Sequence, residues 1–462
     1  MKSVDLKLDK DSIQLNLPDN ADILAMSLPE PVGDPEKAIE KALVNSIDSP
    51  GLDTIIKNKL NAKPDASAVI SISDNTRPVP YTGPEGILWP IVKRLLDHGM
   101  KREKVLVLIG VGTHRALEEN ELRKMLDPRI FEAGVPIHNH DCRDREGLVS
   151  LGTTKRGSQI YINREYMESD IKILTGLVES HFMAGASGGR KAVLPALAGE
   201  RSTFIFHGAE MLASPNARDL VLEGNPCHEE SLETVKMAGA DYIVNVTLDY
   251  KFRLTGVFAG DLEAAHSAAV EKIRSYVIIP IDEEYDIAVS HAGFVGINHY
   301  QACKAAYVAG MAALKPGGRL ILVGNNTDTD PIGSTKYKTC LYLLRFMGAE
   351  GFNRLIRSPD WTFMPDQWEA QMWAKLFEKI PMENFTYYSP YISASDYEFL
   401  PGQDGNIYLP EADRYGETLE HIPAVVEKAL DKAIEQCAEQ GRKNPTVAYL
   451  SDGPYGIPVL KK

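Results

Sequence analysis

The sequence predicts an α/β protein with two α/β domains, each built on a mainly parallel sheet, that face a central active-site cleft. Two observations predict this fold class. Short apolar runs rich in β-branched residues alternate with amphipathic stretches, which is typical of parallel sheets covered by helices on both faces. The alternation starts again near residue 274, and 462 residues are enough for two or more domains.

The first domain is expected over residues 1–273. Its candidate strands are Ala68–Ser73, Lys104–Gly110, Ile171–Gly176, Ser202–Phe206 and Tyr242–Thr247. The stretches Pro84–His98 and Leu117–Leu126 carry apolar residues at helical spacing, so they are expected to form helices between strands.

The second domain is expected over residues 274–441. Its predicted elements are a strand at Asp286–His291, an Ala-rich helix at Tyr300–Leu314, a strand at Arg319–Gly324 and a long helix at Thr418–Gln440. The Lys-Pro-Gly-Gly sequence after the first helix is a sound stop signal. A last strand is expected at Thr446–Ser451, and we expect residues 442–462 to return to the first sheet and complete it.

Composition excludes several classes of protein. Lys and Arg total 50 against 64 Asp and Glu, a net charge of −14, which makes nucleic acid an improbable partner. No apolar run approaches the ~20 residues of a membrane span, and the N-terminus lacks the apolar core of a signal peptide. Five scattered cysteines without a C-x-x-C pair argue against a disulfide framework or a thiolate zinc site, so we expect a cytoplasmic protein.

Polar and ionisable residues gather where the predicted strands end. Ligands of open α/β sheets bind beyond the carboxyl ends of the strands, so these residues are candidates for one site. In the first domain they are Asp74, Arg77, His114, His181, Lys191 and His207, and Tyr300, Gln301 and Lys304 follow a strand of the second domain. Several converging strand ends favour a ligand site over isolated structural histidines.

Three of these groups suit an anion. Arg77 precedes Pro78 in a stiff turn, and a fixed guanidinium suits capture of a carboxylate. The glycine-rich stretch AGASGGRK at residues 184–191 allows a close approach of backbone N–H groups, although its spacing is not that of a Walker A loop. Lys304 lies near a predicted helix start, on one face with Tyr300 and Gln301, close to the positive end of the helix dipole.

The ordered set SDNTRP, GVGTHR, ESHFMAGASGGRK, FHG and HYQACK resembles the lactate racemase family of nickel-pincer enzymes. These motifs span about residues 70–310, and the DQW at Asp366–Trp368 with the SDGPYGIP tail extends the resemblance over most of the chain. The resemblance implies a racemase or epimerase of a 2-hydroxy acid, either lactate-like or a longer hydroxy or sugar acid. Such an enzyme inverts the carbinol carbon by abstracting a hydride and returning it to the other face.

The resemblance also implies roles for individual residues. A nickel-pincer cofactor, a pyridinium thioamide/thiocarboxylate mononucleotide, would be covalently attached at Lys191, with His207 as the nickel ligand and His114 and His181 as the acid/base pair. Arg77 and Lys304 are expected to contact the substrate anion. The residues expected to contact the cofactor are Asp74, Tyr300, Gln301 and Trp368. The implied partners are the small hydroxy acid and the cofactor-biosynthesis enzymes, and a homo-oligomer is compatible with this assignment.

The residues leave two other classes open. KPGGRLILVG at residues 315–324 is similar to a strand entry common in methyl-donor-dependent methyltransferases, so a nucleotide-dependent methyltransferase or dehydrogenase on an α/β fold is the alternative activity. A non-catalytic binding protein that retains the fold is the other.

Overall fold

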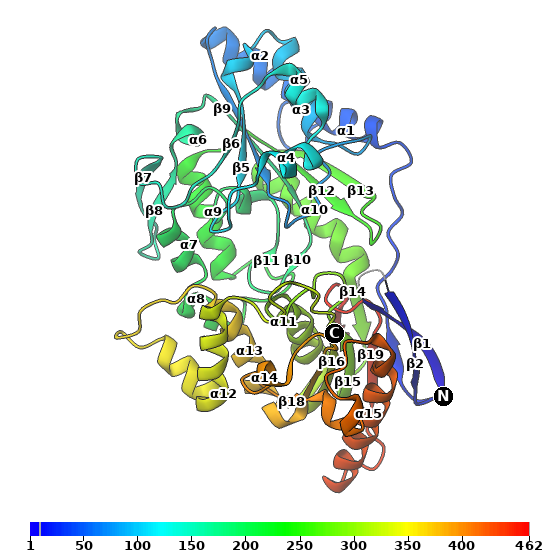
Figure 1. Cartoon of the computed structure of the whole chain (residues 1–462). Helices are drawn as coiled ribbons and strands as arrows, with labels where there is room; N and C mark the ends of the chain where they lie inside the picture. The colour runs from blue at the N-terminus through cyan, green and yellow to red at the C-terminus, as the bar shows by residue number, and fades with distance from the viewer. Residues whose placement is uncertain (9–10, 462) are drawn as a thin grey trace. The chain divides into compact units, whose positions relative to one another are not determined.

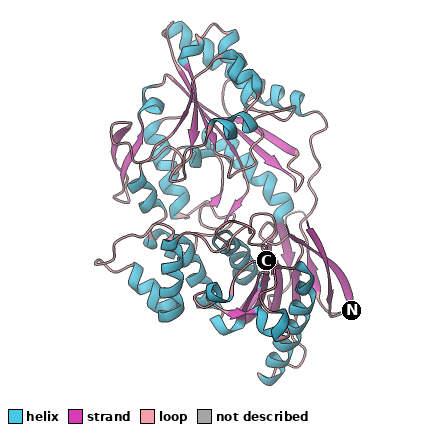
Figure 2. Cartoon of the chain, viewed as in Figure 1, coloured by secondary structure: helices cyan, strands magenta, loops and turns pink. Residues whose placement is uncertain are grey.

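The computed structural model describes residues 1–8 and 11–461 (Figures 1 and 2). The chain divides into two compact units, residues 28–275 and residues 1–27 together with 276–462. Each unit contains a six-stranded sheet, and the strands are mainly parallel in both. The predicted α/β class with mainly parallel sheets is confirmed.

The sheet of unit 28–275 has the strand order β13-β12-β9-β4-β5-β6. All neighbours are parallel except β12 and β13. The strands are β4 (Ala68–Ser73), β5 (Val105–Gly110), β6 (Ile137–Asn139), β9 (Ile171–Leu177), β12 (Tyr242–Leu248) and β13 (Leu254–Gly260). Four of the five strands predicted for this region therefore form where their β-branched residues indicated.

One face of this sheet packs against a helical layer, because the apolar residues of its helices and strands form one buried cluster. Those helices are α1 (Pro35–Val44), α2 (Leu52–Ala62), α3 (Leu88–Asp97), α4 (Glu119–Met125) and α5 (Pro128–Ala133). The unit also contains the hairpin β7 (Leu148–Thr153) and β8 (Gln159–Asn163), with helices α6 (Arg164–Glu168), α8 (Ala209–Ala213), α9 (Pro226–Ala238) and α10 (Leu262–Val277).

The predicted strand at Ser202–Phe206 is wrong. These residues belong to helix α7 (Glu200–Phe206), which starts after Gly199. Ser202, Thr203 and Phe206 are the buried residues, a spacing that places them on one helical face. A five-residue run of β-branched and aromatic residues cannot be assigned by periodicity alone, and here tertiary packing decides for the helix.

The sheet of the other unit has the order β18-β17-β16-β15-β19-β3, and every neighbouring pair is parallel. Its strands are β3 (Asp22–Leu24), β15 (Tyr285–His291), β16 (Leu314–Val323), β17 (Phe385–Tyr388), β18 (Gln403–Asp404) and β19 (Val447–Leu450). The expectation that residues 442–462 complete the first sheet is wrong. Strand β19 pairs with β15 and β3, and β20 (Ile457–Leu460) pairs with β14 (Ile278–Ile281).

Helix α15 (Ile422–Glu439) and the hairpin β1 (Lys2–Leu8)–β2 (Asp11–Leu17) share a buried apolar cluster with this sheet. The remaining helices are α11 (His299–Val308), α12 (Thr335–Ile356), α13 (Gln367–Lys379) and α14 (Ala394–Tyr397) (Figure 1). A π-helical turn, Ala309–Ala313, extends α11 to the start of β16. Across residues 1–8 and 11–461 we find no helix long and apolar enough to cross a membrane.

Candidate active site

Three neighbouring parallel strands of unit 28–275, in the order β9-β4-β5, end at one edge of the sheet. The loop after β4 carries Asp74 and Arg77, the loop after β5 carries His114, and the segment after β9 carries Glu179 and His181. Sequence positions more than a hundred residues apart therefore meet because the strands before them are in register.

Asp74 fixes the orientation of His114. The carboxylate is buried, and Oδ2 lies 2.7 Å from His114 Nδ1, while Oδ1 accepts hydrogen bonds from the Thr76 amide at 3.1 Å and hydroxyl at 2.5 Å. Burial alone raises the pKa of Asp74, but the bond and charge of His114 and the Thr76 bonds bring it below its usual value. Asp74 is thus an acceptor that favours the tautomer of His114 with its proton on Nδ1 and none on Nε2.

Arg77 lies at the same edge and forms an ion pair with Glu179, with 3.2 Å between Nη1 and Oε1. The backbone of Glu179 is in turn tied to Ser187, since its N–H donates to Ser187 Oγ and its carbonyl accepts from the Ser187 N–H, both at 2.9 Å. The glycine-rich loop and the guanidinium of Arg77 are therefore linked through one residue that the sequence did not single out.

His181 and Lys191 face each other across the turn formed by β10 (Ser180–His181) and β11 (Gly185–Ala186). Lys191 Nζ lies 2.9 Å from His181 Nε2. His181 Nδ1 accepts hydrogen bonds from the N–H groups of Met183 and Ala184 at 3.2 and 3.3 Å, so the ring proton belongs on Nε2. Nε2 is then the donor and the Lys191 amine the acceptor, which requires an uncharged amine.

The surroundings favour that uncharged state. Burial lowers the pKa of Lys191 to about 7, and the positive charges of Arg77 and Arg190 act in the same direction. Lys191 Nζ also lies 5.5 Å from the centre of the Phe206 ring. Next to Phe206, burial and the charges of Lys191 and His114 hold the pKa of His207 well below its usual value. These shifts favour the uncharged forms of the Lys191 amine and the His207 imidazole.

Two glycines shape the loop before Lys191. Gly188 and Gly189 have φ angles of +73° and +52°, a region that favours glycine. A Cβ atom on Gly188 would lie 2.7 Å from Val178 Cγ2, and one on Gly189 would lie 2.7 Å from His266 Cδ2. The loop therefore packs too closely for any side chain at either position.

Arg190 holds the same loop from inside. It is 1% exposed, and its guanidinium donates to the carbonyls of Ala184 at 2.7 Å and Ala186 at 2.8 Å, while Nη1 lies 2.9 Å from His266 Nε2. Burial lowers the pKa of Arg190 to about 9, so the group stays charged at neutral pH. The residue before the candidate attachment lysine is thus a fixed positive charge within a ring of acceptors.

A second group of predicted residues lies in the other unit, at the start of α11. Asn298 caps this helix by accepting from the Gln301 N–H at 2.9 Å. Tyr300 accepts a hydrogen bond at its hydroxyl from Trp368 Nε1 at 2.6 Å, and Lys304 Nζ lies 5.3 Å from the Tyr455 ring centre. The spacing of Tyr300, Gln301 and Lys304 does place them together in the first two turns of a helix.

The predicted residues thus fall into two groups. Those assembled in unit 28–275 are Asp74, Arg77, His114, His181, Lys191 and His207, and those in the other unit are Tyr300, Gln301, Lys304 and Trp368. His207 comes from the end of α7 rather than from a strand end. In the part of the chain that the structure describes, no cluster of three or more His, Cys, Asp or Glu residues could hold a metal ion.

Comparisons with known proteins agree on a family. The model described as the lactate racemase N-terminal domain matches residues 8–219. The chain is 32% identical over 357 residues to the lactate racemase of Lactiplantibacillus plantarum, covering 74% of this chain and 77% of that one. It is 30% identical over 410 residues to the lactate racemase of Thermoanaerobacterium thermosaccharolyticum, covering 85% and 86%.

Solved structures show the same fold. The lactate racemase apoprotein of T. thermosaccharolyticum matches over 100% of both chains with a TM-score of 0.81 at 24% identity. A protein from Thermotoga maritima matches 93% of this chain with a TM-score of 0.60 at 16% identity.

These relatives replace the methyltransferase, dehydrogenase and non-catalytic interpretations, because the similarity covers most of both chains. The chain belongs to the lactate racemase family, and it is an isomerase of the racemase type.

Proposed function

We propose that this chain inverts the carbinol carbon of a 2-hydroxy acid, lactate or a close relative, at a nickel-pincer cofactor attached to Lys191. The observation that carries the proposal is the Lys191 amine 2.9 Å from His181 Nε2, in surroundings that lower the pKa of Lys191 to about 7 and that of His207 well below its usual value. The names of two relatives as lactate racemases support lactate as the first substrate to test.

The residues fit the cofactor chemically. An uncharged lysine amine is the form that attacks an acyl or thioacyl carbon, and a neutral imidazole is a ligand that suits nickel. When bound, the group would supply an electrophilic carbon that takes hydride from the substrate and gives it back. Lys191 would hold it covalently and His207 would supply the protein's metal ligand.

The chain's own residues handle the proton. His114 Nε2 is open as a base because Asp74 holds the proton on Nδ1, and Asp74 also stabilises the imidazolium that forms. His181 exchanges its proton only at Nε2, because backbone N–H groups occupy Nδ1. We propose that each histidine serves chiefly one orientation of the substrate hydroxyl.

The substrate carboxylate needs a positive partner. Arg77 presents a planar fork that matches a carboxylate, and we propose that the substrate competes with Glu179 for it. Lys304, near the positive end of α11, is the second proposed anion contact. Tyr300, Gln301, Trp368 and Asp74 are proposed contacts of the cofactor, in accord with the resemblance.

The test uses protein co-produced with cofactor-building enzymes. Intact mass and peptide mapping should place an adduct on the Lys191 peptide, metal analysis should find nickel, and chiral chromatography should show loss of optical purity of lactate or a longer 2-hydroxy acid. The matched control is Lys191→Arg, which keeps a long nitrogen-bearing side chain but cannot form the link. A Lys191→Arg protein that retains nickel and turnover would contradict the proposal.

A further inference from the structure

Tyr81 closes the loop that carries Asp74 and Arg77. This loop follows β4, whose last residue is Ser73, and Tyr81 stands at its other end after two prolines. The ring of Tyr81 belongs to the buried apolar cluster of the first sheet. Its hydroxyl accepts a hydrogen bond from the Ser73 N–H at 2.8 Å, so the two ends of the loop are joined directly.

The same hydroxyl also joins two strands. It lies 2.9 Å from Thr175 Oγ1 of β9, and the Thr175 hydroxyl donates to the Ser71 carbonyl of β4 at 2.9 Å. Because each hydroxyl has one proton, the Tyr81 hydroxyl is the donor to Thr175. The direct pairing of β4 with β9 ends at Ser71 and Leu174, although both strands continue. Tyr81 therefore bridges the two strands just beyond their last paired residues.

The bridged strands carry two loops of the candidate active site. Arg77 follows β4 and its partner Glu179 follows β9, with 3.2 Å between Nη1 and Oε1. Ser71 extends the chain of bonds, because its hydroxyl donates at 2.9 Å to the carbonyl of Ala192, the residue after Lys191. A set of buried hydroxyls thus connects the loop of Arg77, the strand before Glu179 and the segment of Lys191.

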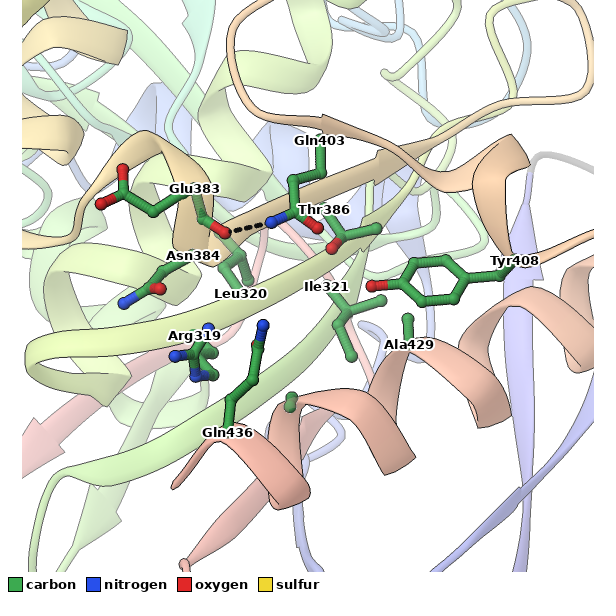
Figure 3. Close-up of a pocket in the computed structure, with 11 residues that line it drawn as sticks. Arg319, Leu320, Ile321, Glu383, Asn384, Thr386, Gln403, Tyr408, Ala429 and Gln436 are labelled. Atoms are coloured by element: carbon green, nitrogen blue, oxygen red, sulfur yellow. Dashed lines mark hydrogen bonds between the residues drawn. The ribbon is translucent and has the colours of Figure 1, made fainter. Parts of the chain in front are cut away.

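Protein groups rather than solvent satisfy the polar atoms at this end of the sheet. In the other unit, a hollow lined by Arg319, Thr386 and Gln436 has a volume of about 10 Å³, which is room for about one water molecule (Figure 3). Tyr81 and Thr175 are each 1% exposed and bond to each other directly. The separation of β4 and β9 at their carboxyl ends is therefore set by side chains of fixed length.

We propose that Tyr81 is a positioning residue of the candidate active site. Its hydroxyl holds the loop of Arg77 at a fixed separation from the loop of Glu179, so that the guanidinium faces the substrate carboxylate. This role rests on the proposed function, which assigns Arg77 to that carboxylate. Tyrosine suits the role because its rigid ring is fixed by packing, while its hydroxyl accepts from one strand and donates to the other.

The first test uses protein without cofactor and Tyr81→Phe, which removes the hydroxyl and keeps the ring. Burial and then the charge of Arg77 lower the pKa of the Lys191 amine, so the pH profile of Lys191 acetylation reports the position of Arg77. We expect Tyr81→Phe to raise the midpoint of this profile, because a released Arg77 spends less time near Lys191. The shift should be absent or much smaller in Arg77→Gln protein, since residues that act through one another are not additive.

Tyr166→Phe is the matched control. Tyr166 is fully buried in α6 of the same unit, and its hydroxyl donates at 2.5 Å to the carbonyl of Gly239, which follows α9. Neither helix carries a proposed site residue. Tyr166→Phe should therefore lower stability in urea unfolding and leave the acetylation midpoint unchanged.

A second variant removes the other half of the bridge. Thr175→Val keeps the branched shape of the side chain and takes away the acceptor of the Tyr81 hydroxyl. It should raise the acetylation midpoint as well, and it decides the question if Tyr81→Phe does not fold.

The second test uses enzyme loaded with cofactor. Tyr81→Phe should lower kcat/KM for the 2-hydroxy acid about tenfold, because a small displacement of a contact residue has a large effect on productive binding. Most of the loss should appear in KM, since Arg77 contacts the carboxylate before and during the reaction. The loss should shrink in the Arg77→Gln background.

An unchanged acetylation midpoint in Tyr81→Phe would overturn the proposal, as would an equal shift in Tyr166→Phe or in the Arg77→Gln background. An unchanged KM in active Tyr81→Phe enzyme would also overturn it. When Tyr81→Phe is unfolded, an unchanged midpoint in Thr175→Val has the same meaning. A shifted midpoint in protein that racemises no hydroxy acid would refute the proposed function and leave the positioning of Arg77 intact, because acetylation needs no cofactor.

Discussion

The Lys191 amine should be reactive near neutral pH in protein that carries no cofactor. Its pKa falls from 10.5 to about 7 because of burial and the charges of Arg77 and Arg190. At pH 7.5 the neutral fraction is then about three quarters, against about one in a thousand for a lysine at 10.5. Pulsed acetylation followed by mass spectrometry of the Lys191 peptide should give a rate that levels off just above pH 7. Exposed Lys57 in the same digest is the reference for reagent decay.

Variants that remove one charge near Lys191 should shift the pKa of its amine in a predictable direction. Arg77→Gln removes a positive neighbour and should raise the midpoint of the pH profile, whereas Glu179→Gln removes a negative neighbour and should lower it. An interaction of ~1 kcal/mol corresponds to about 0.7 pKa units, so acetylation at pH 6 should change by about fivefold, in opposite directions. A midpoint above pH 9.5, or shifts of the same sign in both variants, would refute the account of Lys191.

The other predictions concern the anion contacts, the bases and a sheet end. Arg77→Gln and Lys304→Gln should each lower kcat/KM about 30-fold or more while the Lys191 adduct stays intact. Steady-state kinetics of both variants tests this, and an unchanged kcat/KM in both would contradict the assignment of the two anion contacts. His114→Ala and His181→Ala should each nearly stop net inversion, yet rapid mixing with each pure isomer should change the cofactor absorbance for one isomer only. That isomer should differ between the two variants, and loss of the same isomer in both would rule out two bases. Asp286 should contribute acid-sensitive stability. Burial alone raises its pKa, but bonds from Thr446, Arg442 and Lys315 lower it to about 2. A carboxylate with a lowered pKa stabilises the fold above its unfolded pKa near 4 and loses that effect as the pH falls toward 2. Asp286→Asn should therefore cost about 2 kcal/mol at pH 7 and less at pH 2 in urea unfolding, and an equal cost at both values would contradict the linkage.

Strands could be predicted from the sequence where the pattern lies within the strand itself. Ala68–Ser73 and Tyr242–Leu248 are mostly apolar and rich in β-branched residues, which is typical of strands buried on both faces. The run at Ser202–Phe206 is also rich in β-branched and aromatic residues but forms a helix, in which Ser202, Thr203 and Phe206 are buried on one face. Pairing is not a local property either. Nothing within Val447–Leu450 indicates that it lies between β15 and β3 rather than beside the first sheet.

The candidate site shows the same division. Motif residues such as His114 and Lys191 could be proposed from order and spacing, since loops after parallel strands converge. The partners that orient these residues or shift their pKa values could not be predicted in this way. That Asp74 holds His114, that Glu179 pairs with Arg77 and that Arg190 lies against His266 are relations between distant segments, and each depends on strand register and loop conformation.

The way one unit interrupts the other affects the order in which the chain can fold during synthesis. Strand β3 near the N-terminus pairs with β19, and Ser27 N–H donates to Tyr276 O at 3.0 Å, so residues 28–275 leave and re-enter the other unit at one point. On the ribosome, residues 28–275 are complete while β3 still waits for a partner more than 400 residues later. The surroundings of Lys191 are therefore translated in full before the second sheet can close, because that sheet needs β19 at Val447–Leu450.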